Sequence, residues 1–255
     1  MTSDQIRFLS LLRREVNRFM KIKRQTVGAP LLETFLYISV FGAALGSRIH
    51  QLHGFRYIVF VVPGLILMAW AMNAFSNNAS SILQQKIQRA IDDQLSSPAS
   101  PVELLLAFTF GGFLRGAMVA TLTFVAADIL VWIPVHHPLV LLPGVFLVGF
   151  FFASIGVLVG VRAEQFDDVS FYQTFVLQPL IFLGGVFYSA SLLPEPFQTL
   201  THVDPVYYMI ALVRYGFLGY SETSIALSLG LLTAAAGLLF AVNLRLFTRG
   251  YRLRA

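Results

Sequence analysis

The chain has 255 residues, of which 56% are hydrophobic and 12% are charged. This composition lies outside the range of ordinary water-soluble domains and is typical of an integral membrane protein. The sequence contains no cysteine, which excludes disulfide scaffolds, cysteine-ligated metal sites and thiol catalysis. The net charge of +5 could suggest nucleic-acid binding in a soluble protein. In a membrane protein we interpret it as a signal of orientation, and we expect no nucleic-acid partner.

The hydrophobic stretches predict six membrane spans, since a span needs roughly 20 apolar residues. They cover residues 30–48, 57–76, 101–131, 139–161, 170–188 and 225–247. The fold class expected is therefore an all-α integral membrane protein with one transmembrane domain over residues 1–255. A further apolar segment, 189–222, is interrupted, and we expect it to form short outer or re-entrant helices between the fifth and sixth spans.

Basic residues at both ends of the chain predict the orientation. The region before the first span contains Arg7, Arg13, Arg14, Arg18, Lys21, Lys23 and Arg24, and the C-terminal end contains Arg245, Arg249, Arg252 and Arg254. The outer loop 132–138 has no lysine or arginine. Because cytoplasmic segments carry the excess of positive charge, both termini are expected in the cytoplasm, which requires an even number of spans.

Residues 1–28 are too polar and basic for a secretory signal and are predicted to form an amphipathic helix on the inner membrane surface. Its apolar residues recur at helical spacing: Leu9, Leu12, Val16, Phe19 and Met20. Two interpretations stay open for this interface helix, an electrostatic membrane anchor or a contact site for a partner protein. The candidate contact residues are Arg13, Arg14, Phe19 and Lys21.

The first inner loop predicts a second amphipathic helix over residues 83–98. Leu83, Ile87, Ile91 and Leu95 form its apolar stripe. The helix either rests on the bilayer surface or docks a soluble partner and transmits force from it. The candidate coupling residues are Leu83, Lys86, Ile87, Arg89, Ile91, Asp92 and Asp93.

The third span begins with a well-defined signal and carries a charge in its interior. Ser100, Pro101 and Glu103 match an N-cap, a first helical proline and a capping box. Arg115 follows about 14 residues into the span, where a charge must face protein or water. Asp128 is about 20 Å further along the helix and cannot pair with it. Arg115 is thus either part of a structural contact or a gating or substrate-contact residue.

Several other residues have local interpretations. Glu33 and Asp128 lie close to span ends and are interpreted as interfacial. The pairs Gly42–Gly46, Gly112–Gly116 and Gly156–Gly160 are interpreted as helix-packing positions. Asp204 and Pro205 predict the N-cap and first residue of a helix that ends near Leu218. At about 21 Å this helix is too short to cross the bilayer.

A set of motifs in the second half of the chain resembles one family. The motifs are Phe166-Asp-Asp, Thr174-Phe-Val-Leu-Gln-Pro-Leu, Leu183-Gly-Gly-Val-Phe-Tyr-Ser, Leu192-Leu-Pro, Asp204-Pro and Arg214-Tyr-Gly-Phe-Leu-Gly, preceded by Phe60-Val-Val-Pro-Gly and Lys86-Ile-Gln-Arg. This combination resembles the ABC type-2 transporter permeases, in particular short bacterial exporters similar to the nodulation-factor export permeases. The resemblance covers essentially the whole chain. It implies six spans, an interface helix, a coupling helix and short outer helices.

The resemblance also implies partners and a localisation. Two permease subunits, expected to be identical, would form the pathway in the bacterial inner membrane, and two copies of an ABC-type ATPase would bind ATP and magnesium. This chain itself has no phosphate-binding Gly-x-x-x-x-Gly-Lys-Ser/Thr loop, so we expect no cofactor in it and no enzymatic activity of its own. The expected cargo is an amphiphile moved outward, such as a lipid, a lipid-linked glycan or a hydrophobic drug. The gating or pathway candidates are Arg115, Phe187, Tyr188, Tyr207, Tyr208 and Arg214.

Two alternatives remain. A membrane enzyme lacks support because Asp167 and Asp168 have no third carboxylate at Phe171, and their expected role is capping of the fifth span. His136 and His137 are adjacent and diverge, so neither a metal site nor a catalytic residue is expected. An ion-coupled transporter or channel would usually have more polar groups at mid-membrane depth than Arg115. Both alternatives predict activity without an ATPase partner.

Overall fold

The computed structural model of the protein describes residues 3–22, 24–42, 46, 48–49 and 51–252. The first half contains α1 (Ser3–Lys21), the π-helix η1 (Arg24–Gly28), α2 (Ala29–Val40), a hairpin of β1 (Gln51–Leu52) and β2 (Phe55–Arg56), α3 (Tyr57–Ile87), α4 (Ala90–Leu95) and α5 (Pro101–Leu130). The second half contains α6 (Pro138–Arg162), α7 (Phe166–Phe171), the π-helix η3 (Tyr172–Leu177), α8 (Gln178–Leu183), the 3-10 turn η4 (Ala190–Leu192), α9 (Glu195–Val203), α10 (Pro205–Leu218) and α11 (Ile225–Arg249).

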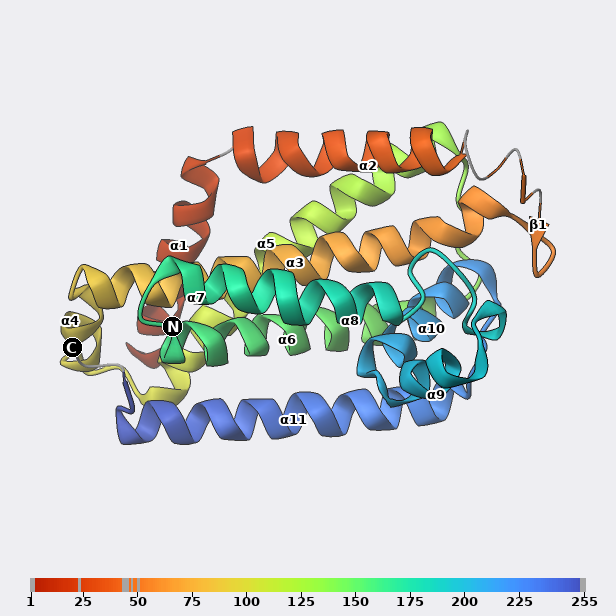
Figure 1. The fold of residues 1–255 in the computed structure, drawn as a ribbon. Coiled ribbons are helices and arrows are strands. Elements are labelled where there is room, and N and C mark those ends of the chain that lie inside the picture. Colours follow the sequence, from red (N-terminus) through yellow and green to blue (C-terminus); the bar gives the residue numbers. More distant parts are fainter. Residues whose placement is uncertain (1–2, 23, 43–45, 47, 50, 253–255) are drawn as a thin grey trace.

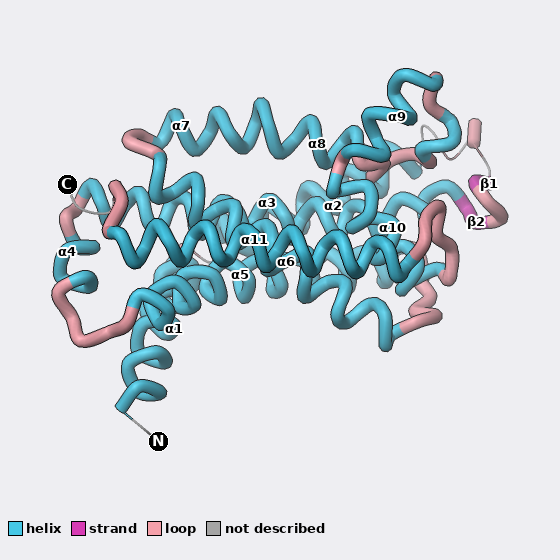
Figure 2. Tube along the Cα trace, turned by 90° about the horizontal axis from the view of Figure 1, so that it is seen from below, coloured by secondary structure: helices cyan, strands magenta, loops and turns pink. Residues whose placement is uncertain are grey.

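Helix α3 is the centre of the bundle. Helices α5 and α6 pack along it, α11 covers α6 on the far side, and α2 lies at the opposite edge (Figure 1). The continuous helical stretch α7–η3–α8 runs beside α3 (Figure 2). One end of the bundle holds α1, α4 and the C-terminal end of α11, whereas the hairpin, α9 and α10 lie at the other end (Figure 1).

Four described helices are long and apolar enough to cross a membrane: α3, α5, α6 and α11. They coincide with the predicted spans 57–76, 101–131, 139–161 and 225–247, although α3 extends to Ile87. The predicted spans 30–48 and 170–188 do not meet this criterion within the described residues. Helix α2 has 12 residues, and residues 43–45 and 47 of the first predicted span lie outside the described residues.

The predicted fifth span is wrong at its C-terminal end. Helix α8 ends at Leu183 instead of reaching residue 188. A Cβ atom on Gly184 would lie 2.9 Å from Val206 Cγ1, and Gly185 has a φ of +92°, which only glycine adopts easily. The chain therefore leaves the helix here in order to pack against α10.

Glycines bring α6 close to α3. A Cβ atom on Gly156 would lie 2.5 Å from the carbonyl oxygen of Phe75, and one on Gly160 would lie 3.0 Å from that of Ala79. Gly112 and Gly116 likewise face α3 from α5. In lipid, helices have no hydrophobic driving force for association. Close approach therefore stabilises the bundle through van der Waals contact. The packing interpretation of these two pairs is confirmed, while Gly42–Gly46 encloses residues outside the described ranges.

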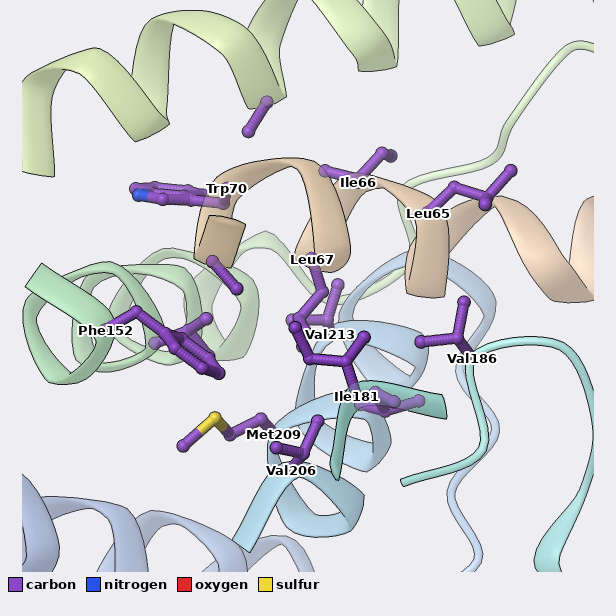
Figure 3. Close-up of a cluster of buried hydrophobic side chains, with 14 of the residues drawn as sticks. Leu65, Ile66, Leu67, Trp70, Phe152, Ile181, Val186, Val206, Met209 and Val213 are labelled. Atoms are coloured by element: carbon purple, nitrogen blue, oxygen red, sulfur yellow. The ribbon is translucent and has the colours of Figure 1, made fainter. Parts of the chain in front are cut away.

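Apolar side chains fill the space between these helices. Leu67 and Trp70 of α3, Phe152 of α6 and Met209 of α10 belong to one cluster of buried side chains (Figure 3). Ile181 of α8 joins the same cluster, with an exposed fraction of 0%. The short helix α10 is therefore part of the core.

The local signals for α10 are confirmed. The backbone N–H of Val206 donates to Asp204 Oδ1 at 2.8 Å, Pro205 follows the cap, and Gly219 ends the helix with a φ of +72°. The capping box of α5 is also present, with the Ser100 N–H donating to Glu103 Oε2 at 2.6 Å. The Asp168 carboxylate caps α7 by accepting from the N–H groups of Glu164 and Gln165.

The close contact at Gly156 predicts a defined cost for one added methyl group. Gly156→Ala should lower the thermal unfolding midpoint in detergent, because overpacking against a backbone atom costs about 1–3 kcal/mol. Gly237→Ala on α11 is the matched control, since nothing lies within 4 Å of its Cβ position, and it should leave the midpoint unchanged or raise it. Equal midpoints for the two variants would contradict the packing of α6 on α3.

Candidate partner-docking end and membrane cavity

A buried carboxylate attaches α1 to the rest of the bundle. Glu15 has an exposed fraction of 1%. Its Oε2 accepts from the Ser81 hydroxyl at 2.6 Å, and its Oε1 accepts from the Gln85 side-chain amide at 3.1 Å. Gly111 of α5 makes room for it, because a Cβ atom there would lie 2.7 Å from Glu15 Cβ. The side of α1 with Glu15 therefore faces α3 and α5.

Two arginines of α1 add contacts to α3, and one of them also reaches α4. Arg14 Nη2 donates to Gln85 Oε1 at 2.9 Å and to Gln94 Oε1 at 2.8 Å. Arg18 Nη2 donates to the carbonyl oxygen of Asn77 at 2.7 Å. Burial lowers the pKa of the Arg18 guanidinium, and the Glu15 carboxylate opposes this shift. We refer to these side chains together as the Glu15 network, which comprises Arg14, Glu15, Arg18, Asn77, Ser81, Gln85 and Gln94.

The predicted apolar positions of the interface helix lie on different sides of α1. Phe19 is buried against the bundle with an exposed fraction of 3%, whereas Leu9 and Met20 are exposed at 47% and 37%. That the helix lies flat on the membrane surface stays a prediction. Glu15 was not predicted at all. The signal for it is the polar stripe on α3, where Asn77, Ser81 and Gln85 recur every four residues in an otherwise apolar helix.

The predicted single helix over 83–98 is wrong. Helix α3 continues through Ile87, Arg89 adopts a left-handed φ of 57°, and the six-residue α4 follows. The turn lets the α4 side chain Ile91 pack against α5 and α6, where its exposed fraction is 2%. If α3 and α4 formed one straight helix, Ile91 would lie further along the axis of α3 and would not reach this cluster.

Several candidate coupling residues are therefore internal. Leu83 is fully buried. The Lys86 ammonium donates to the carbonyl oxygens of Val161 and Ala163, each at 2.7 Å, and so binds the C-terminal end of α6. Asp92 is half-buried. The residues that remain accessible are Ile87, Arg89 and Asp93, together with Arg13, Arg14 and Lys21 of α1.

A basic cleft lies between α1 and the α3–α4 turn. Its volume is about 1000 Å³, and its lining includes Arg13, Arg14, Lys21, Gln84 and Gln88. The cleft borders the exposed part of α4, so a macromolecule docking here would touch both helices.

A second cavity of about 370 Å³ lies between α2, α3, α5 and the η3–α8 stretch. Arg115 of α5 lines it with an exposed fraction of 9%. Glu33, predicted to be interfacial, lines the same cavity from α2. Among the described residues no acidic oxygen lies within 4.0 Å of the Arg115 guanidinium, since the ion pairs of this part of the chain involve other groups.

Arg214, a predicted gating residue, holds together the end of the bundle that contains α9 and α10. Its guanidinium lies 3.8 Å from the ring centroid of Phe60, donates to the carbonyl oxygen of Gly185 at 2.9 Å, and pairs with Glu222 at 3.5 Å. The Tyr207 hydroxyl donates to the Glu222 carbonyl oxygen at 3.4 Å. These contacts attach α10 to the N-terminal end of α3.

The remaining gating candidates divide into two groups. The hydroxyls of Tyr188 and Tyr208 donate to the carbonyl oxygens of Phe182 and His202, each at 2.9 Å, and so satisfy free carbonyl groups near helix ends. Phe187 instead stacks on Phe41 with ring centroids 4.6 Å apart. It faces α2 on the same side as Tyr37, which also lines the cavity of Arg115.

Asp204 predicts a pH dependence of stability. Burial raises the pKa of its carboxyl group to about 6. A folded-state pKa above the ordinary value means that stability is lost as the pH rises through about 6. We expect a lower thermal midpoint at about pH 7.5 than at about pH 5, and Asp204→Asn, which keeps the helix cap, should weaken this difference. An identical pH dependence in the variant would refute this role.

The Glu15 network predicts that α1 detaches when its carboxylate is removed. Glu15→Ala leaves buried polar partners and two arginines without their acceptor, which should cost about 3 kcal/mol. Hydrogen exchange in α1 should then accelerate, whereas Asn17→Ala, an exposed position of the same helix, should leave it unchanged. Unchanged exchange in the glutamate variant would show that other contacts hold α1.

Comparisons with known proteins agree with this architecture. Residues 6–218 match the model of the family described as ABC-2 type transporter. The inner membrane transport permease YadH of Escherichia coli (strain K12) is 39% identical over 246 residues, which cover 96% of each chain. Nodulation protein J of Rhizobium meliloti (strain 1021) is 25% identical over 243 residues, 95% of this chain and 93% of its own. The chain therefore belongs to the ABC-2 type transporter permease family.

Proposed function

We propose that this chain is the transmembrane subunit of an ABC exporter that moves an amphiphilic substrate outward. Two copies would form the pathway, and two copies of a separate ATPase would bind ATP and magnesium, because this sequence has no phosphate-binding loop of its own. The substrate class includes lipids, lipid-linked glycans and hydrophobic drugs. Family membership supports the transport role and the need for an ATPase partner.

The proposal includes six spans with both termini in the bacterial cytoplasm. Besides the four clear spans, α2 leads into the remainder of 30–48, and α7–η3–α8 covers 18 residues from Phe166 to Leu183, about 27 Å of helix. Both described ends of the chain lie with α4 at one end of the bundle (Figure 2). That end carries most of the arginine and lysine residues, which favours the cytoplasmic side.

The observation that carries the proposal is the Glu15 network. It ties the exposed surfaces of α1 and α4 to α3, the helix that lines the Arg115 cavity and reaches the outer end. A soluble partner that moves the α1–α4 surface would therefore move α3 with it. The accessible side chains Arg13, Arg89 and Asp93 offer contacts for such a partner.

Copurification tests the proposal. We expect a P-loop ATPase to be recovered with the tagged protein from native membranes in mild detergent and identified by mass spectrometry. Asp93→Lys reverses an exposed charge of α4 without touching the core and should reduce the recovered ATPase about tenfold or more, as for loss of an interface hot spot.

Glu195→Lys is the matched control, because Glu195 is exposed on α9 at the opposite end of the bundle. It should leave ATPase recovery unchanged. Recovery of intact protein without any ATPase in several detergents would contradict the proposal and favour a transporter or channel that works without ATP.

A further inference from the structure

We propose that the cavity of Arg115 binds a phosphate group, carried by the headgroup of an amphiphile, with Arg115 as the anion-binding residue. The inference rests on the proposed function for its meaning in transport, but the binding site is argued from the geometry of this chain alone. Its volume of about 370 Å³ is at the lower end of the range of small-ligand sites and suits one headgroup.

Arg115 is buried without a partner among the residues that the structure describes. It is 91% buried, since its exposed fraction is 9%. Its Nε atom has no hydrogen-bond acceptor within the described part of the chain. A guanidinium has five donors and no acceptor, so an anion entering the cavity would supply what the protein leaves out. Arginine is also the side chain best suited to two parallel hydrogen bonds with phosphate oxygens.

The wall of the cavity adds neutral donors around this charge. Asn73 and Ser76 line it from α3, and Gln173 and Gln178 line it from the η3–α8 stretch. The side-chain amides of the two glutamines make no hydrogen bond with the residues that the structure describes. They are therefore free to donate to a bound phosphate.

A π-helical turn places both glutamines on the cavity. The backbone N–H of Gln178 donates to the carbonyl oxygen of Gln173, which is the five-residue bond of a π-helix. In a regular α-helix residues five apart point about 140° away from each other. Here one lies above the other, and both line the same cavity. Such π-turns occur frequently at functional sites.

The two charged side chains of the cavity differ in burial. Arg115 is the one basic residue among the described lining residues, and it is buried. Glu33 is the one carboxylate among the described residues that line the cavity, and it is exposed on α2 without an ion pair to Arg115 within 4.0 Å. Glu33 therefore leaves the Arg115 guanidinium available for an anion, although the negative charge of Glu33 repels a bound phosphate.

Aromatic rings adjoin this polar cavity. Tyr37 lines it and contacts Phe41 and Phe187, with ring centroids 5.9 Å away in both cases. Phe182 contacts Phe187 in turn at 5.5 Å. A molecule with a phosphate at Arg115 would thus find an apolar surface beside it for a lipid-like tail, which is why we infer an amphiphile.

Calorimetric binding to the purified protein in a neutral maltoside detergent tests the proposal. The probes are dihexanoyl phosphatidic acid, inorganic phosphate and the uncharged dihexanoyl glycerol. We expect phosphatidic acid to bind and Arg115→Gln to weaken it at least about tenfold, the usual loss for one charged hydrogen-bonding partner. Arg115→Lys keeps the charge and should restore part of the affinity. Dihexanoyl glycerol should show no dependence on Arg115.

Glu33→Gln tests whether the ligand binds as an anion. Removal of the negative charge from the cavity should let this variant bind phosphatidic acid as tightly as the original chain or more tightly. A variant that folds normally but binds phosphatidic acid at least about tenfold more weakly would overturn the proposal. An Arg115→Gln variant that folds normally, with an unchanged elution profile and thermal midpoint, and binds phosphatidic acid with unchanged affinity would also overturn it.

The soluble probe identifies the source of the phosphate. Binding of phosphatidic acid alone, dependent on Arg115, assigns a lipid headgroup, whereas equal binding of inorganic phosphate assigns a free phosphate group. Both results support the anion site. The calorimetric measurement needs no ATPase. A failure to bind phosphatidic acid would therefore not affect the copurification result, and a failure to recover an ATPase would not affect the binding result.

Discussion

Polar groups inside a membrane-crossing helix must find partners within the protein, because lipid offers none. Helix α3 carries such groups in the half that we propose to lie on the cytoplasmic side, at Asn77, Asn78, Ser81 and Gln85. Asn78 donates to the carbonyl oxygen of Ala153 at 2.9 Å, which ties α3 to α6. The others bind Glu15, Arg14 and Arg18 of α1. The polar stripe of α3 thereby decides which helices surround it.

This constraint gives α3 a mechanical role. It is one continuous helix of 31 residues, about 46 Å long. At one end the Glu15 network joins it to α1 and α4, and at the other end the Phe60 ring lies under the Arg214 guanidinium. The Arg115 cavity lies between the two ends. A force applied to α1 and α4 can therefore change the cavity and the helices at the opposite end of the bundle through one packed element, which is a physical basis for coupling.

Local signals in the sequence predicted helix ends well. The caps at Ser100 and Asp204 and the termination at Gly219 depend on neighbours within a few residues. Long-range partners could not be predicted in this way. Lys86 binds carbonyl groups 75 and 77 residues away, and Glu15 meets Ser81 at a separation of 66. Spacing alone therefore placed Lys86 on a partner-facing surface, although the end of α6 occupies it. The break at Arg89 was missed because the apolar stripe fits an unbroken helix equally well.

If α1 and α4 form one rigid unit with the end of α3, the distance between the two helices stays constant, and a distance measurement tests this directly. The chain has no cysteine, so cysteines introduced at Asn17 of α1 and at Ser96 directly after α4 can be spin-labelled without background. Both positions are exposed, and neither is a proposed ATPase contact. Pulsed electron resonance would then compare the ATPase complex with and without ATP. We expect one narrow distance distribution that is the same in both states. A shift of several Å, or a second population in the presence of ATP, would show that α1 and α4 move separately and would contradict the account.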